Sequence, residues 1–372
     1  MGGNALKVAP TERLMARDYH ALARDLTASL VREFGGRAQA IPAYRSKQDF
    51  GDLDVLVEAE MATIEELEAF AKAFGHARQV EVGSKTVYLQ GVSLPPPQPN
   101  RGPNKNEGRQ VLSYDHRSHP DQQVGFQVDL IQAPADEFDI SLAYFSYNDL
   151  GNLIGRIAHK MGFSYGHRGL MLPLREGTHL LGKVLVSSHV DECLAFLGYD
   201  PHRFHEGFGN LEDVFAYACS TPYFHPDIFL LENRNHAGRT RDRKRPTYQK
   251  FLQHLKGLPP ATYFQFPEDS GKWLARAHHH FPDLKEKMEH VFKERDRLER
   301  VKEHFNGRLV SQWTGLSGKD LGDFLSRFSL GAGGPEGILR MMEEGGASQV
   351  RREVMAALDA QRAGARPKAG RP

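Results

Sequence analysis

The chain has 372 residues, which is long enough for two or three domains and a large hydrophobic core. Its formal net charge of +1 excludes a protein-wide field that would attract nucleic acid, so any basic surface must be local. The two cysteines exclude a disulfide framework and a four-cysteine zinc site. No stretch is apolar enough for a signal peptide or a membrane span, and we expect a cytoplasmic protein that contacts no membrane.

Helical and strand patterns alternate through the first half of the chain. In chain order they predict a helix over 11–34, a strand over 52–57, a helix over 62–74, a hairpin of 79–82 with 86–89, a strand over 124–132 and a helix over 148–161. This alternation indicates an α/β fold.

Two carboxylates stand one residue apart at the start of the strand over 52–57. In a strand, Asp52 and Asp54 point to the same face with their bases about 6 to 7 Å apart. At an effective dielectric near 20 they repel each other by roughly 2 kcal/mol, and a divalent cation between them would reverse this cost. Oxygen ligands favour Mg²⁺ or Mn²⁺ over zinc, and the spacing suits two ions. The alternative is a surface strand with solvated acids.

Residues 44–57 read Y-R-S-K-Q-D-F-G-D-L-D-V-L-V. This stretch resembles the nucleotidyltransferase signature of the DNA polymerase β (family X) superfamily. The resemblance implies an α/β (α+β) palm with a mixed antiparallel sheet and flanking helices, and a third carboxylate on a later strand. Asp129, alone among apolar residues, supplies that acid, and a lone buried carboxylate needs a partner charge. Asp52, Asp54 and Asp129 are therefore the expected catalytic and metal-binding residues.

The resemblance extends from about residue 35 to residue 198, with matching order and spacing. It implies that Tyr144 and Phe145 lie beside the sugar and base of a nucleotide and that Asn152 reaches the base edge. It places Arg156 near a template strand. The alternatives are core packing for the aromatic pair and a solvated helix face for Arg156.

Basic residues just before the two acids are the expected triphosphate ligands. Arg45 and Lys47 can donate charge-assisted hydrogen bonds to phosphate oxygens, and Ser46 and Gly51 belong to the same nucleotide-binding stretch. Where the family has Gly-Ser, this chain has Ile41-Pro42, which lacks one backbone amide. The alternative is a solvated basic loop.

Composition changes along the chain predict its domains. We expect a catalytic domain over 1–198 with a flexible Pro/Gly-rich insertion at 94–110, a helical and partly basic accessory domain over 199–365, and a flexible tail at 366–372. The accessory domain is predicted to contain helices over 211–219 and 248–255, a long, highly charged helical stretch over 271–308 and a compact helical unit over 312–328.

The accessory domain has one strongly basic stretch, over 234–250. Its cations are candidates for binding the phosphates of a nucleic acid, and a solvated loop is the alternative. The candidates are Arg239, Arg241, Arg243, Lys244 and Arg245.

These features predict an enzyme, a nucleotidyltransferase that depends on two Mg²⁺ or Mn²⁺ ions. It would move a nucleoside monophosphate from an NTP or dNTP to a nucleic-acid hydroxyl and release pyrophosphate. Both a DNA polymerase and an RNA or tRNA 3′-end enzyme stay open, because residues 318–325 faintly resemble an element of tRNA nucleotidyltransferases and poly(A) polymerases. The same residues would also suit nucleotide transfer to a small molecule or protein, or an inactive nucleotide-binding module.

Overall fold

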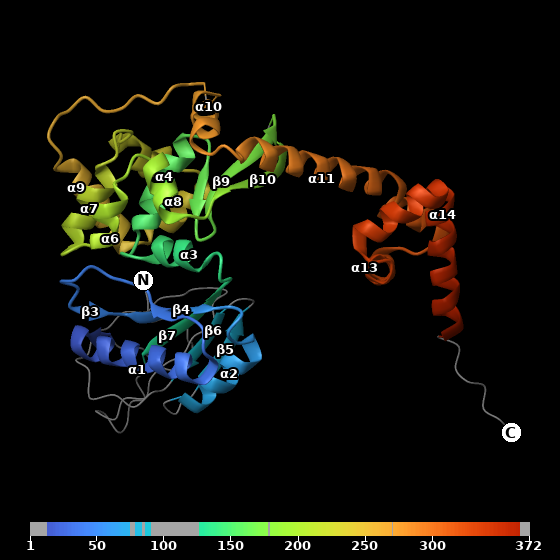
Figure 1. The fold of residues 1–372 in the computed structure, drawn as a ribbon, viewed down its shortest axis with the longest axis horizontal. Coiled ribbons are helices and arrows are strands. Elements are labelled where there is room, and N and C mark those ends of the chain that lie inside the picture. The colour runs from blue at the N-terminus through green and yellow to red at the C-terminus, as the bar shows by residue number, and fades with distance from the viewer. Residues whose placement is uncertain are drawn as a thin grey trace. The chain divides into compact units, whose positions relative to one another are not determined.

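The computed structural model describes residues 13–74, 79–83, 86–90, 126–177, 179–269 and 271–364, with the backbone alone over 79–83, 86–90 and 363–364. It forms two compact units, Met1–Pro173 with Lys183–Leu284 and Leu174–Gly182 with Lys285–Pro372 (Figure 1). Residues 199–284 thus group with the first unit, whereas the sequence placed a boundary at 198, because their helices contact the helices of the predicted palm. The predicted insertion at 94–110 and the predicted tail lie outside the described residues.

A five-stranded mixed sheet forms the base of the first unit, in the order β2-β4-β7-β6-β5. β4 and β7 are parallel, and the other neighbours are antiparallel. The strands are β2 (Ala38–Ala40), β4 (Asp52–Glu58), β5 (Gln79–Gly83), β6 (Thr86–Gln90) and β7 (Gln127–Ala133). The predicted mixed α/β character and the β5–β6 hairpin are confirmed.

Two helices, α1 (Ala16–Phe34) and α2 (Ile64–Ala73), cover one face of this sheet (Figure 1). Leu53 and Val55 of β4 and Val128 of β7 are fully buried in the core beneath them. Because side chains alternate along a strand, the acids of β4 and β7 project from the opposite face. The predicted helix start at residue 11 is wrong, since β1 (Leu14–Met15) pairs with β3 (Asp49–Phe50) before α1 begins.

Short helices form a second layer of the first unit, on the acidic side of the sheet (Figure 1). They are α3 (Phe138–Phe145), α4 (Leu150–Lys160), α5 (Val190–Phe196), α6 (Pro201–Glu206), α7 (Leu211–Cys219), η2 (Pro226–Phe229), η3 (Leu231–Asn233), α8 (His236–Arg243), α9 (Pro246–Lys256) and α10 (Gly271–His280). A small three-stranded sheet comprises β8 (Ser164–Gly166), β9 (Gly169–Glu176) and β10 (His179–Ser187), and the ends of β9 and β10 within Leu174–Gly182 group with the second unit. The predicted helices over 211–219 and 248–255 are confirmed, as α7 and within α9. The basic stretch over 234–250, for which a solvated loop was the alternative, is largely helical and forms α8 and the start of α9.

The second unit is built mainly from helices around their own core. They are α11 (Leu284–His304), α12 (Gly307–Thr314), α13 (Gly318–Gly331) and α14 (Gly334–Gly364). Val310, Phe324 and Val354 are among the buried residues of this core. The helical stretch predicted over 271–308 is confirmed, and it divides into α10, α11 and the start of α12, with a break around Pro282, where the missing amide hydrogen interrupts the helix. None of the described helices is long and apolar enough to span a membrane.

Candidate active site

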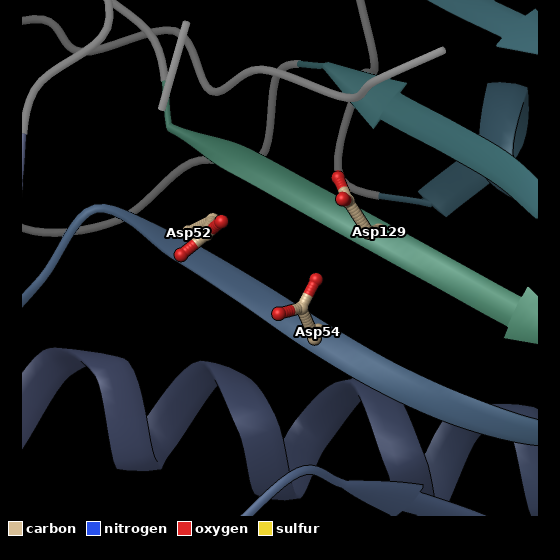
Figure 2. A group of neighbouring side chains, drawn as sticks. All are labelled: Asp52, Asp54 and Asp129. Atoms are coloured by element: carbon tan, nitrogen blue, oxygen red, sulfur yellow. The ribbon is translucent and has the colours of Figure 1, made fainter. Parts of the chain in front are cut away.

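Three carboxylates converge on the sheet face that α1 and α2 leave open. Asp54 of β4 and Asp129 of β7 are register partners on adjacent parallel strands, and Asp52 lies one strand step away on the same face. Ligand oxygens of the three acids lie within 4.8 Å of one another. Figure 2 shows the carboxylates side by side on the two strands. The structure therefore brings together the three acids that the sequence singled out.

Gln127 orients the most buried of these acids. Its Nε2 donates a hydrogen bond of 2.9 Å to Oδ1 of Asp129, whose residue is only 2% exposed. Gln127 is two residues before Asp129 and therefore projects from the same face of β7. The two-residue spacing of Gln127 and Asp129 in one strand is the sequence signal that could have predicted this hydrogen bond. No motif in the sequence includes Gln127.

The donor set fits a hard divalent cation. Carboxylates 4.8 Å apart repel each other by about 3 kcal/mol per pair at an effective dielectric of about 20. The three acids offer oxygen ligands only, which suit Mg²⁺ or Mn²⁺ rather than zinc. Asp52, Asp54 and Asp129 are the residues that would hold such ions.

Gln127→Leu is expected to weaken Mn²⁺ binding by about ten- to a hundredfold, because groups that orient a metal ligand have effects of that size. The measurement is a titration of Mn²⁺ by electron paramagnetic resonance. Gln39→Leu, on the edge strand β2, is the control and should bind Mn²⁺ as the wild type does. Equal Mn²⁺ affinities for Gln127→Leu and the wild type would contradict the role given to Gln127.

A lysine and a tyrosine stand close to the acids. The Nζ of Lys47 lies 4.4 Å from the centre of the Phe50 ring, and burial lowers the pKa of Lys47, while the charge of Asp52 opposes that change. Tyr19 stacks on Phe50 with ring centres 3.6 Å apart. Burial, together with the charges of Asp54 and Asp52, raises the pKa of Tyr19. Tyr19 belongs to α1, and nothing in the sequence signals its place here.

A cleft of 1130 Å³ opens over Asp52 and Asp54, between the sheet and the helical layer of the first unit, and the buried Asp129 is not among the residues that line it. Nine of the predicted site residues line it. They are Lys47, Asp52, Asp54, Tyr144, Phe145, Asn152, Arg241, Lys244 and Arg245. Residues that the sequence did not single out also line it, among them His167, His236 and Thr240.

The loop that begins the signature stretch is attached to the helical layer. The amide of Arg45 donates to the carbonyl of Phe208 and the amide of Ser46 to that of Gly209. The Nη1 of Arg45 donates to the carbonyl of Glu206 at 3.1 Å. Arg45 and Ser46 are not among the residues that line the cleft, and neither is Gly51. Of the predicted phosphate ligands on this loop, Lys47 alone faces the cleft.

Arg156, which was predicted to lie near a template strand, is buried between helices. It is 6% exposed, and its Nε and Nη2 both donate to the carbonyl of Ile228, at 3.1 and 2.8 Å. Burial and the nearby charge of Arg234 lower its pKa to about 10. A buried guanidinium that donates to a backbone carbonyl cannot lie along a template strand. The predicted contact of Arg156 with nucleic acid is therefore wrong. The helical pattern alone does not show which side of α4 the next helices cover.

The aromatic pair at the end of α3 lies between the core and the cleft. Phe145 packs against the buried cluster of Leu56, Ala133 and Phe138 and stacks on His167 at 6.0 Å between ring centres. Tyr144 and Phe145 meet edge to face at 5.4 Å. Both side chains are half-buried, so they combine the packing role and the cleft-lining role that the sequence left open.

α8 contributes the cations on the helical side of the cleft. The Nη2 of Arg241 donates to Oδ1 of Asn152 at 2.8 Å, and its Nε pairs with Oδ1 of Asp242 at 3.0 Å. Arg245, next to the helix, pairs with Asp149. Asp242 is fully buried and pairs as well with Arg234, at 2.7 Å. The position of Arg241 is therefore fixed from two sides.

No model of a known protein family matches this chain, and a search of curated proteins found no match either.

Proposed function

We propose that the chain is a metal-dependent nucleotidyltransferase that moves a nucleoside monophosphate from an NTP or dNTP to a hydroxyl of a nucleic acid. The observation that supports this most is the meeting of Asp52, Asp54 and Asp129 on one face of the sheet, where Asp52 and Asp54 line a cleft large enough for a nucleotide. The mixed sheet that carries them supports the further proposal of a palm like that of the DNA polymerase β superfamily.

The roles of the residues follow from their positions. Asp52 and Asp54 would hold both Mg²⁺ or Mn²⁺ ions, and Asp129, oriented by Gln127, would hold the ion next to the acceptor hydroxyl. When bound, the ions would supply Lewis-acid activation of that hydroxyl and neutralise the leaving pyrophosphate. Lys47 offers a further positive charge beside Asp52.

The cations of α8 that point away from the cleft support a nucleic-acid acceptor. Arg239 and Arg243 are one helical turn apart and are not among the residues that line the cleft. A row of this kind fits successive phosphates of a nucleic-acid backbone.

The double variant Arg239→Gln and Arg243→Gln is expected to bind single-stranded nucleic acid more weakly at low salt. Each lost phosphate contact makes the negative slope of log affinity against log salt shallower by about 0.7. The loss of two contacts should therefore make the slope shallower by about 1.4. Fluorescence anisotropy at several salt concentrations measures it. An unchanged slope would show that these arginines do not contact phosphate.

The proposed activity is tested by incubating the protein with α-labelled NTPs or dNTPs and Mg²⁺ or Mn²⁺. Primed DNA, single-stranded RNA, tRNA and no nucleic acid serve in turn as acceptor. We expect label to enter at least one nucleic acid, and Asp52→Ala to abolish the transfer. No incorporation with any acceptor, in the wild type and in Asp52→Ala alike, would refute the proposal.

A further inference from the structure

The charged residues of α8 and the residue that follows it divide between two faces. At 3.6 residues per turn, Arg241 and Lys244 lie on one side and Arg239 and Arg243 on the other. The first pair lines the cleft that contains Asp52, and the second pair does not. One face of this basic segment therefore lines the cleft, and the other face does not.

The cations on the cleft side differ in what already neutralises them. Arg245 is paired with Asp149, and Arg241 shares Asp242 with Arg234. The side chain of Lys244 makes no ion pair or hydrogen bond within the part of the chain that the structure describes, and it is exposed. Its ammonium group is thus available to an anion in the cleft.

The loop before the acids offers little to a triphosphate. Arg45 donates to the carbonyl of Glu206 and does not line the cleft. Pro42 does line the cleft, but it has no amide hydrogen to donate. Lys47 is the one cation of residues 41–51 among the residues that line the cleft. A bound triphosphate therefore needs positive charge from another element.

We propose that the cleft face of α8 binds the phosphates of the nucleoside triphosphate, with Lys244 and Arg241 as the ligands. This inference rests on the proposed function and adds the site of its donor substrate. Lys244 contributes an unpaired point charge, and Arg241 contributes a guanidinium that Asp242 and Asn152 hold in place. The helical layer, rather than the loop before the acids, thus supplies most of the charge that meets the triphosphate.

The test measures equilibrium binding, with Mg²⁺ present, of a nucleoside triphosphate analogue whose α,β-bridge is a methylene group. Lys244→Ala is expected to lower its affinity about ten- to a hundredfold, the range for hydrogen bonds to charged groups. Inorganic tripolyphosphate should compete less well with the analogue in this variant. Lys244→Arg, which keeps the charge, should restore most of the affinity.

Lys256→Ala, an exposed lysine in the last turn of α9, is the matched control and should bind the analogue as the wild type does. Thermal unfolding of each variant shows that it is folded. Wild-type affinity in both Lys244→Ala and Arg241→Gln would overturn the inference, and retained transfer in those variants would leave the proposed function standing. Equal losses in Lys244→Ala and Lys256→Ala would also overturn it. A wild type that neither binds the analogue nor transfers label would refute both proposals.

Discussion

Asp54→Asn is expected to lower the rate of nucleotide transfer by about a thousandfold or more. Asp54 is the acid that faces both Asp52, along β4, and Asp129, across to β7. Metal ions stabilise transition-state charge by several kcal/mol, and about 4 kcal/mol corresponds to a thousandfold in rate. Single-turnover transfer of labelled nucleotide measures the effect.

The stability of the same variant separates catalysis from folding. Removing one of three mutually repelling carboxylates should leave the free energy of unfolding, measured without metal, unchanged or slightly higher. Asp139→Asn is the matched control, because its side chain is 76% exposed and it is not among the residues that line the cleft. Transfer by Asp54→Asn at the rate of Asp139→Asn would contradict the role of the three acids.

Asp242→Asn is expected to lower the free energy of unfolding of the first unit by about 3–5 kcal/mol. Asp242 is fully buried, and the Arg234 side chain that pairs with it is only 7% exposed. Removing the carboxylate charge leaves Arg234 buried beside Arg241 and near Arg156 without its counter-charge. Urea denaturation followed by circular dichroism measures the loss.

Two comparisons make this prediction specific. Asp139→Asn breaks the exposed pair with Arg37 and should cost less than about 1 kcal/mol. The double variant Asp242→Leu with Arg234→Leu removes both buried charges and should be more stable than Asp242→Asn alone. If Asp242→Asn lost no more stability than Asp139→Asn, the buried pair would not hold α8 in place.

The sequence predicted the elements whose pattern is local. The alternation at Asp52 and Asp54 defines β4, and the helical spacing of apolar residues defines α7 with both of its ends. The pairing of Asp54 with Asp129 depends on the parallel register of β4 and β7, which join segments about 75 residues apart. Only the resemblance to a family, and not periodicity, pointed to that third acid.

The rest of the site depends on contacts between elements, which no single segment encodes. Arg156 and Arg241 both belong to helices with polar faces, yet packing buries the first against Ile228 and directs the second into the cleft. Arg45 was predicted from its charge, but the backbone pairing of its loop with residues 208 and 209 directs it elsewhere. α14 escaped prediction because Gly345 and Gly346 interrupt its helical dihedral angles, and glycines are typical of helix ends.

The most direct measurement is a crystal structure of the protein with Mn²⁺ and the methylene-bridged nucleoside triphosphate analogue, in which anomalous scattering locates the manganese. We predict manganese bound by Asp52, Asp54 and Asp129, with the triphosphate between these ions and the cleft face of α8. Manganese that is absent from these three acids while the analogue is bound elsewhere on the protein would contradict the account.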